Sequence, residues 1–234
     1  MNPFSLRDRL AEVRGRLAAS AQRSGRAPGE VTLIGVIKTL PTEIVAEAVG
    51  LGLTDLGENR VQEAEAHQLG VARHAARWHM IGHLQRNKAG KALSLFDLVH
   101  GVDDADVAGT LDRRAEAVSR VLPVLIEVNV SGEASKFGVA PEGLASLADR
   151  MRVMPHLELR GLMTVGAPVE RAEDARPGFA RLRDVRDALA GRIGLPLAEL
   201  SMGMSGDFEV AVEEGATLVR VGSAIFGSRP PAAR

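Results

Sequence analysis

One lysine follows directly on a nearly apolar run of the sequence. Residues 31–37 read VTLIGVI, and Lys38 comes next. Burying a lysine amine without a partner is costly, so the stem of such a lysine ordinarily packs while its ammonium group reaches water. The alternative is a Schiff-base lysine, whose amine attacks a carbonyl group once desolvation favours its neutral form. That chemistry suits either an aldolase or an enzyme that binds pyridoxal phosphate (PLP).

Two segments near the C-terminus are rich in glycine and serine. Residues 201–206 read SMGMSG, and Gly222 and Ser223 form the second pair. Glycine lets a phosphate group approach backbone N–H groups closely, serine adds a hydroxyl donor, and a helix beginning near Asp207 would add its positive end. Small residues are also common in ordinary turns. Combined with Lys38, the two segments bear on the choice between PLP and an aldolase substrate.

Arg220 is the third residue with chemical potential. In an extended strand it shares a face with Leu218, while Val219 and Val221 take the opposite face. Valines suit the face under helices, which directs Arg220 inward. One interpretation is a salt bridge with an inward carboxylate such as Glu127. The other is a cation facing the pyridine nitrogen of PLP, which leaves that nitrogen unprotonated because arginine accepts no proton.

The elements that must position these residues alternate regularly. Eight short apolar runs are separated by alanine-rich, charged stretches with helical periodicity; the runs are 31–37, 53–57, 78–82, 98–102, 123–130, 157–165, 198–204 and 218–226. Strict β-α alternation predicts a parallel sheet, and eight units predict an α/β fold of the closed (β/α)8 TIM barrel type. A doubly wound open sheet is the main alternative, but no G-x-G-x-x-G follows the first run. In such barrels the active site lies at the carboxyl ends of the strands.

The chain is expected to form one domain over residues 1–234. Apolar residues at helical spacing predict an amphipathic N-terminal helix within 1–25, and the barrel is predicted over 31–227. The polar stretch 170–178 is predicted to be a loop that leads into the seventh helix. We find no linker, low-complexity segment or signal-peptide core.

Composition excludes several classes of site. The formal net charge is -1 and there is no cysteine, so nucleic-acid binding is disfavoured and disulfides, iron-sulfur clusters and thiolate zinc sites are excluded. No apolar run approaches the roughly 18 residues of a membrane span. We expect a cytoplasmic monomer that binds neither nucleic acid nor membranes.

Two further features are weaker candidates for chemistry. His79 and His83 lie four residues apart, but that spacing aligns two metal ligands only on a helix, and this segment reads as a strand end. We therefore expect no metal. Lys136 is the rival Schiff-base residue, but it lies in the polar segment SGEASKFG, where its amine would stay hydrated. A surface role is expected for it.

Six motifs occur in order along nearly the whole chain: IKTLP, GENRVQEA, WHMIGHLQRNK, VNVSGEASKFGV, LRGLMTVG and LSMGMSGDFEVAVEEGATLVRVGSAIFG. Together they resemble the pyridoxal phosphate homeostasis protein family, the YggS/PROSC type, whose fold is similar to the N-terminal barrel domain of bacterial alanine racemase. Arg60 stands where that family usually has an aromatic residue, and Gly206 where it often has an acidic one.

The resemblance implies a PLP site in which Lys38 forms the Schiff base. It also implies Asn59 near the ring, Arg220 facing the pyridine nitrogen, Met202 and Met204 near the cofactor, and Ser201, Gly222 and Ser223 at the phosphate.

The same resemblance bears on catalysis. Alanine racemase uses a lysine and a partner-subunit tyrosine as its two bases, and this sequence contains no tyrosine. The favoured hypothesis is therefore a non-catalytic PLP-binding protein of vitamin B6 homeostasis that buffers the cofactor or delivers it to PLP-dependent apoenzymes. The alternative is a PLP-dependent, racemase-like enzyme of low activity, with His79 or His83 as a substitute base. A Schiff-base aldolase without PLP is the third possibility.

Overall fold

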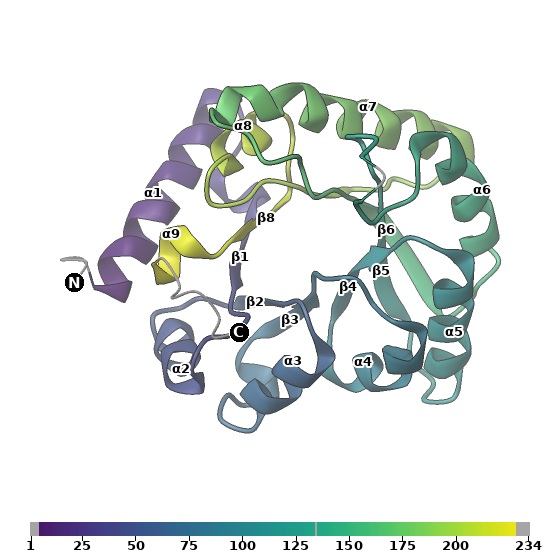
Figure 1. Cartoon of the computed structure of the whole chain (residues 1–234), viewed down its shortest axis with the longest axis horizontal. Coiled ribbons are helices and arrows are strands. Elements are labelled where there is room, and N and C mark those ends of the chain that lie inside the picture. Colours follow the sequence, from purple (N-terminus) through teal and green to yellow (C-terminus); the bar gives the residue numbers. More distant parts are fainter. Residues whose placement is uncertain (1–4, 134, 228–234) are drawn as a thin grey trace.

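Eight parallel strands close into a barrel in the computed structural model, which describes residues 5–133 and 135–227. Each strand pairs with the next, and the eighth pairs with the first, so the sheet has no free edge. Figure 1 shows the helices arranged around the strands. The predicted (β/α)8 TIM barrel is confirmed. Residues 1–4 of the segment predicted as the N-terminal helix lie outside the described residues.

The strands are β1 (Thr32–Val36), β2 (Asp55–Glu58), β3 (Arg77–Met80), β4 (Leu98–Val102), β5 (Leu122–Glu127), β6 (Leu157–Met163), β7 (Glu199–Ser201) and β8 (Leu218–Val221). The helices are α1 (Leu6–Arg23), α2 (Thr42–Gly50), α3 (Val61–Gln68), α4 (Ala89–Leu95), α5 (Ala105–Glu116), α6 (Pro141–Met151), α7 (Arg176–Ile193), α8 (Phe208–Glu213) and α9 (Ser223–Phe226). Short 3-10 turns are η1 (Pro28–Glu30), η2 (Arg73–Ala75), η3 (Arg86–Lys88) and η4 (Ala172–Ala175). Within the described ranges, none of the helices has the length and apolar content that crossing a membrane requires.

The apolar side chains form two separate cores. The large outer core lies between the barrel wall and the helices and includes Val219 and Val221. A small cluster lies inside the barrel and consists of Ile34, Leu98, Leu125, Met163 and Leu218. Because successive strand residues point to opposite faces, Arg220 shares the inward face with Leu218, as the sequence predicted.

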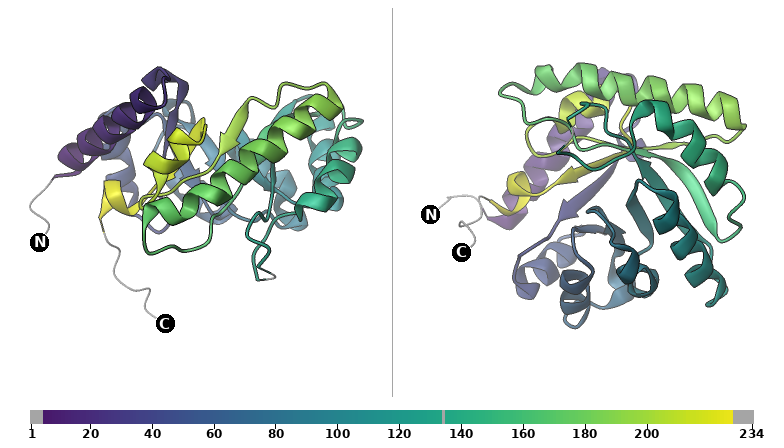
Figure 2. Two further views of the ribbon diagram at one scale, coloured as in Figure 1. Left: turned by 90° about the horizontal axis from the view of Figure 1, so that it is seen from above. Right: turned by 45° about the vertical axis from the view of Figure 1, so that its right-hand side comes forward.

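The N-terminal helix α1 is an addition to the eight-fold pattern. Ser5 caps it by accepting a hydrogen bond from the Asp8 backbone N–H, and the helix packs along α8 and α9 on the outside of the barrel (Figures 1 and 2). Arg16 of α1 also forms an ion pair with Glu209 of α8, with 2.7 Å between nitrogen and oxygen. The helix therefore covers the side of the barrel that lies next to β8.

Several predicted boundaries differ from the observed elements, and two differences change the type of element. The polar stretch 170–178 is not all loop: it holds η4, and α7 begins at Arg176. Pro177 suits that first turn because its missing N–H has no intrahelical partner there. The last apolar run is strand only as far as Val221, and the chain then turns at Gly222 into α9. Apolar character alone does not separate a short strand from a buried helical turn.

We predict that Gly161→Ala destabilises the barrel. Gly161 of β6 lies opposite Glu199 of β7, and an added Cβ would overlap the carbonyl oxygen of Glu199 and lie 2.6 Å from its carbonyl carbon. Backbone cannot rotate away as a side chain can, so we expect a loss of roughly 1–3 kcal/mol in the free energy of unfolding. Urea unfolding of both proteins measures this.

The matched control is Gly15→Ala on the exposed face of α1, where nothing lies within 4 Å of the added Cβ. That change should stabilise the protein by about 0.5–1 kcal/mol, because alanine favours a helix over glycine. An unchanged unfolding midpoint for Gly161→Ala would contradict the β6–β7 packing described above.

Candidate functional site

A cavity of about 400 Å³ lies where β1, β7 and β8 end. Such a volume lies within the range of small-molecule sites. Its walls are Val36, Lys38, Met204, Ser205, Gly206, Arg220, Gly222 and Ser223. The structure thus brings together five of the eight residues selected from the sequence: Lys38, Met204, Arg220, Gly222 and Ser223. They meet because barrel closure pairs β1 with β8, so that Ile34 lies opposite Arg220.

The turn that carries Lys38 is held by a buried pair on neighbouring elements. Lys38 is half-buried two residues beyond β1, and Thr39 next to it has a left-handed backbone, with φ of 62°. The carbonyl of Leu40 accepts a hydrogen bond of 2.8 Å from Nε2 of His67. Nδ1 of His67 lies 2.6 Å from Oε1 of the buried Glu58, and this hydrogen bond raises the pKa of His67. The pair therefore fixes the turn that orients Lys38.

Arg220 is buried and bonded to neutral oxygens. Nη1 donates to Oγ of Ser201 at 2.6 Å, and Nη2 donates to the carbonyl of Thr164 at 2.8 Å. Burial lowers the pKa of Arg220 to about 10, so the guanidinium stays charged at neutral pH. Glu127, considered above as a salt-bridge partner, accepts neither of these hydrogen bonds. A guanidinium carries five N–H donors, and these two bonds to described residues use two of them, so donors remain for a ligand.

A row of buried polar side chains continues from Ser201 across the barrel. Nδ1 of His100 on β4 lies 2.8 Å from Oγ of Ser201, and Nε2 of His100 lies 3.0 Å from Nδ1 of His79. Nε2 of His79 lies 3.0 Å from Oδ1 of Asp55. His79 is therefore an interior residue of β3, not a free base at a strand end. Sequence reasoning missed His100, whose signal was a single polar residue within the apolar run LVHGV.

Ser205 belongs to the predicted glycine- and serine-rich segment 201–206, although the sequence prediction does not name it individually. Its Oγ accepts hydrogen bonds from the backbone N–H groups of Gly222, at 3.1 Å, and Ala224, at 3.2 Å. Asp207 supports the same loop, since its Oδ1 accepts a bond of 2.6 Å from the N–H of Met204. These bonds use the three backbone N–H groups, and they hold the hydroxyl of Ser205 beside Ser223 at one end of the cavity with its own proton left to donate. Such an arrangement suits an anionic group.

Three of the selected residues do not line this cavity. Ser201 lies behind Arg220, and the side chain of Met202 is fully buried in the outer core. Asn59 lines a different hollow of about 750 Å³ between α3 and the loop after β3. Arg60, one of the two departures from the family pattern, also lines that hollow. Gly206, the other, lines the Lys38 cavity, where an added Cβ would meet no atom within 4 Å.

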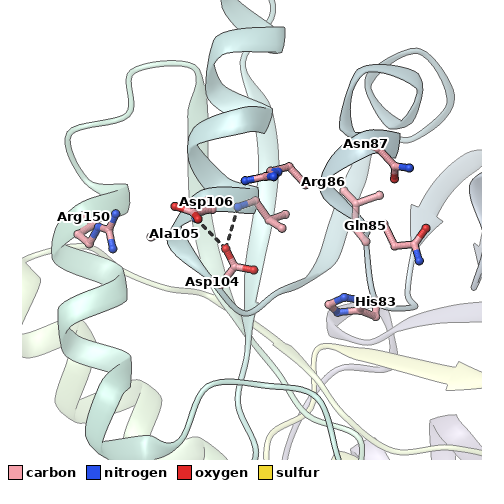
Figure 3. Close-up of a pocket in the computed structure, with 10 residues that line it drawn as sticks. His83, Gln85, Arg86, Asn87, Asp104, Ala105, Asp106 and Arg150 are labelled. Carbon is pink, nitrogen blue, oxygen red and sulfur yellow. Dashed lines mark hydrogen bonds between the residues drawn. The ribbon is translucent and has the colours of Figure 1, made fainter.

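Another hollow, of about 760 Å³, lies beside the start of α5 (Figure 3). Asp104 caps this helix by accepting hydrogen bonds from the N–H groups of Asp106 and Val107, at 2.7 and 2.8 Å. Arg86 and Arg150 lie on either side. Neither Lys38 nor Arg220 contributes to this hollow, so the predicted chemistry lies elsewhere.

Lys136 differs from its sequence prediction. Its Nζ is buried rather than hydrated and lies 3.0 Å from Oε1 of Glu133. The residue does not line the cavity that holds Lys38 and Arg220. Within residues 5–133 and 135–227, no three histidine, aspartate or glutamate side chains gather in a way that could hold a metal ion.

Glu127 is a buried acid inside the barrel mouth. Among the described residues, its Oε2 has no hydrogen-bond partner. Burial, together with the nearby charge of Asp103, raises the pKa of Glu127 to about 7, although the charge of Arg220 opposes the shift. The group therefore changes its charge near neutral pH.

Known proteins resemble the chain over almost its full length. The family model of the alanine racemase N-terminal domain matches residues 10–230. The pyridoxal phosphate homeostasis protein of Aquifex aeolicus is 42% identical over 222 residues, which cover 95% of this chain and 97% of the relative. The protein of the same name from Pseudomonas aeruginosa is 43% identical over 96% of both chains.

Solved structures agree with this relationship. PipY of Synechococcus elongatus, solved with PLP bound, is 36% identical, with a TM-score of 0.84 over 95% of this chain and 100% of that one. Alanine racemase of Clostridium difficile is 13% identical, with a TM-score of 0.71 over 94% of this chain and 60% of that one, and shares the fold alone. The chain belongs to the alanine racemase N-terminal domain family and, within it, to the pyridoxal phosphate homeostasis proteins.

Proposed function

We propose that this protein binds PLP as a Schiff base on Lys38 and serves PLP homeostasis. The observation that carries the proposal is the single cavity in which Lys38 and Arg220 meet the glycine- and serine-rich turns of β7 and β8. A lysine amine is the protein group that holds a PLP aldehyde covalently. The bound PLP of the related PipY structure supports the same ligand.

The phosphate of PLP fits the end of the cavity formed by Ser205, Gly222 and Ser223. The hydroxyl of Ser205 accepts hydrogen bonds from the backbone N–H groups of Gly222 and Ala224, so its own proton is free to be donated to a ligand. Ser223 lines the same cavity. Hydroxyl and backbone donors around a glycine let phosphate oxygens approach closely.

The pyridine nitrogen fits beside Arg220. A guanidinium only donates hydrogen bonds, so it pairs with an unprotonated ring nitrogen and gives it no proton. PLP supplies an electron sink for carbanions when its ring nitrogen is protonated, and this sink is weakened when the nitrogen faces an arginine. Arg220 therefore favours holding the cofactor over driving carbanion chemistry.

The role that follows is to store PLP and pass it to PLP-dependent apoenzymes, as a monomer in the cytoplasm. The absence of tyrosine from the sequence, and with it one of the two racemase bases, supports a non-catalytic role. Glu127, a buried acid that titrates near neutrality, is the observation that favours the racemase-like alternative. Exchange of the α-proton of added amino acids with solvent would identify such an enzyme.

Lys38→Ala should abolish covalent PLP binding. Borohydride reduction of the wild-type protein with PLP should leave a phosphopyridoxyl group on the peptide that contains Lys38, and mass spectrometry locates it. The variant should bind PLP at least about tenfold more weakly, because only non-covalent contacts remain. Lys91→Ala is the control, since Lys91 pairs with Glu65 on the surface. A modified Lys136 peptide, or a variant with unchanged affinity, would overturn the proposal.

Ser223→Asp should separate phosphate recognition from aldehyde capture. A carboxylate near the phosphate costs about 1–4 kcal/mol by charge repulsion, so the affinity for PLP should fall tenfold or more. The affinity for pyridoxal, which lacks the phosphate, should stay within about twofold. Titration of the absorbance change with each ligand measures both. Equal losses for the two ligands would place the phosphate elsewhere.

Glu127→Gln should remove a pH dependence of stability. The pKa of Glu127 rises from an ordinary 4.5 to about 7 on folding, so the folded protein holds this proton more tightly than the unfolded chain does. The free energy of unfolding of the wild type should therefore fall as pH rises through that window. At about pH 8 the variant should be more stable than the wild type by on the order of 2 kcal/mol.

Urea unfolding across the pH range tests this expectation. Below the ordinary pKa both forms of residue 127 are neutral, so the two proteins should have similar stability there. Parallel pH profiles for wild type and variant would show that Glu127 titrates normally.

A further inference from the structure

The row of polar side chains behind Arg220 crosses the whole barrel interior. It starts at Asp55, the first residue of β2, and passes through His79, His100 and Ser201 to Arg220 on β8. The four links measure 3.0, 3.0, 2.8 and 2.6 Å. Both imidazoles and the serine are fully buried, while Asp55 lines a separate cavity of about 360 Å³ next to α1. The row thus joins that cavity to the proposed cofactor cavity.

Donor and acceptor chemistry gives this row a single direction. Arg220 can only donate, so the hydroxyl oxygen of Ser201 accepts its N–H. The proton of Ser201 then points to Nδ1 of His100, the remaining hydrogen-bond partner of this hydroxyl among the described residues. His100 must therefore carry its hydrogen on Nε2 and donate to Nδ1 of His79. His79 in turn donates from Nε2 to Asp55.

The charges agree with this direction. Burial lowers the pKa of His79 and, more strongly, that of His100, so both rings are neutral near neutral pH. Burial opposes ionisation of Asp55, but the hydrogen bonds from His79 and Thr54 keep its pKa below the usual value. The reverse direction would need a proton on Asp55 or a second proton on His79. The row of hydrogen bonds therefore runs from the Arg220 cation to the Asp55 anion through Ser201 and two neutral imidazole rings.

We propose that Asp55, His79, His100 and Ser201 are positioning residues that hold the guanidinium of Arg220 toward the ring of the cofactor through this one-way chain. The inference rests on the proposed function and extends it. Ser201, His100 and His79 each have their only suitable proton committed, and Asp55 accepts the last one, so Arg220 cannot turn without leaving a buried hydrogen-bonding group unpaired. Because the Ser201 proton is committed to His100, the hydroxyl donors to the phosphate are Ser205 and Ser223.

The first test needs no cofactor. NMR of the apoprotein with ¹⁵N-labelled histidine reports which ring nitrogens of His79 and His100 carry hydrogen. We expect both rings to be neutral, with hydrogen on Nε2, and to remain so when PLP is added. A His100 ring with hydrogen on Nδ1, or a charged His79, would overturn the proposed direction.

The second test compares two substitutions of His100. In His100→Asn the amide oxygen can take the place of Nδ1 and accept from Ser201, whereas in His100→Leu no acceptor remains. We expect His100→Leu to bind PLP about tenfold more weakly, with a shifted absorption band, and His100→Asn to stay near wild type. PLP binding by both variants is measured far below their melting temperatures. His156→Asn is the control, because His156 is not part of the hydrogen-bonded row.

The outcomes separate this inference from the proposed function. If the wild type forms no Schiff base on Lys38, the proposed function fails whatever the variants do. If the wild type binds PLP and His100→Leu binds it with the same affinity and spectrum, only the positioning role fails. If His100→Leu does not fold, the NMR result on the wild type still decides the direction of the hydrogen bonds in this row.

Discussion

The buried guanidinium of Arg220 is the constraint on which the site depends. Removing a cation from water is costly, and proteins usually offset that cost with a carboxylate at contact distance. Here the two hydrogen bonds of the guanidinium go to the neutral oxygens of Ser201 and Thr164. The charge is therefore held in place without being neutralised by contact, and it stays available to the ring of a ligand. The interior of this barrel is organised around that arrangement.

The closed sheet explains why Arg220, which is far from Lys38 in the sequence, lies beside it in the structure. Register pairing sets Ile34 of β1 opposite Arg220 of β8, so the two strands end side by side (Figure 1). Two independent supports then fix the two sides of the cavity. The Glu58–His67 pair holds the turn after β1, while the chain through His100 holds Arg220. A Schiff base and a ring contact can thus form with little rearrangement, which is how preorganisation strengthens binding.

The alternation of side chains along the strands allowed much of the fold and of the site to be predicted from the sequence. The eight-fold pattern predicted the barrel, and the valines beside Arg220 predicted its inward direction. The same alternation places Ser201 and Met202 on opposite faces of the sheet, so Met202 points outward and is buried in the outer core. The family resemblance by itself does not predict this orientation. The segments LVHGV and SMGMSG contain His100 and Ser205, but strand alternation does not predict what these two side chains contact. Their partners lie across the barrel or in another loop, and no local spacing encodes such contacts.

In the proposed complex, Lys38 and Arg220 together favour holding the cofactor over using it in catalysis. A reversible covalent bond at a half-buried lysine lets a ligand leave by simple exchange of its aldehyde. In the proposed complex, an arginine at the ring nitrogen would lower the ability of the ring to stabilise negative charge and would so disfavour removal of a proton from a bound amino acid. Because Arg220 is locked by neutral, one-way hydrogen bonds, no proton is readily available to reverse that effect. The row of hydrogen bonds behind Arg220 and the absence of tyrosine therefore both agree with the proposed storage role.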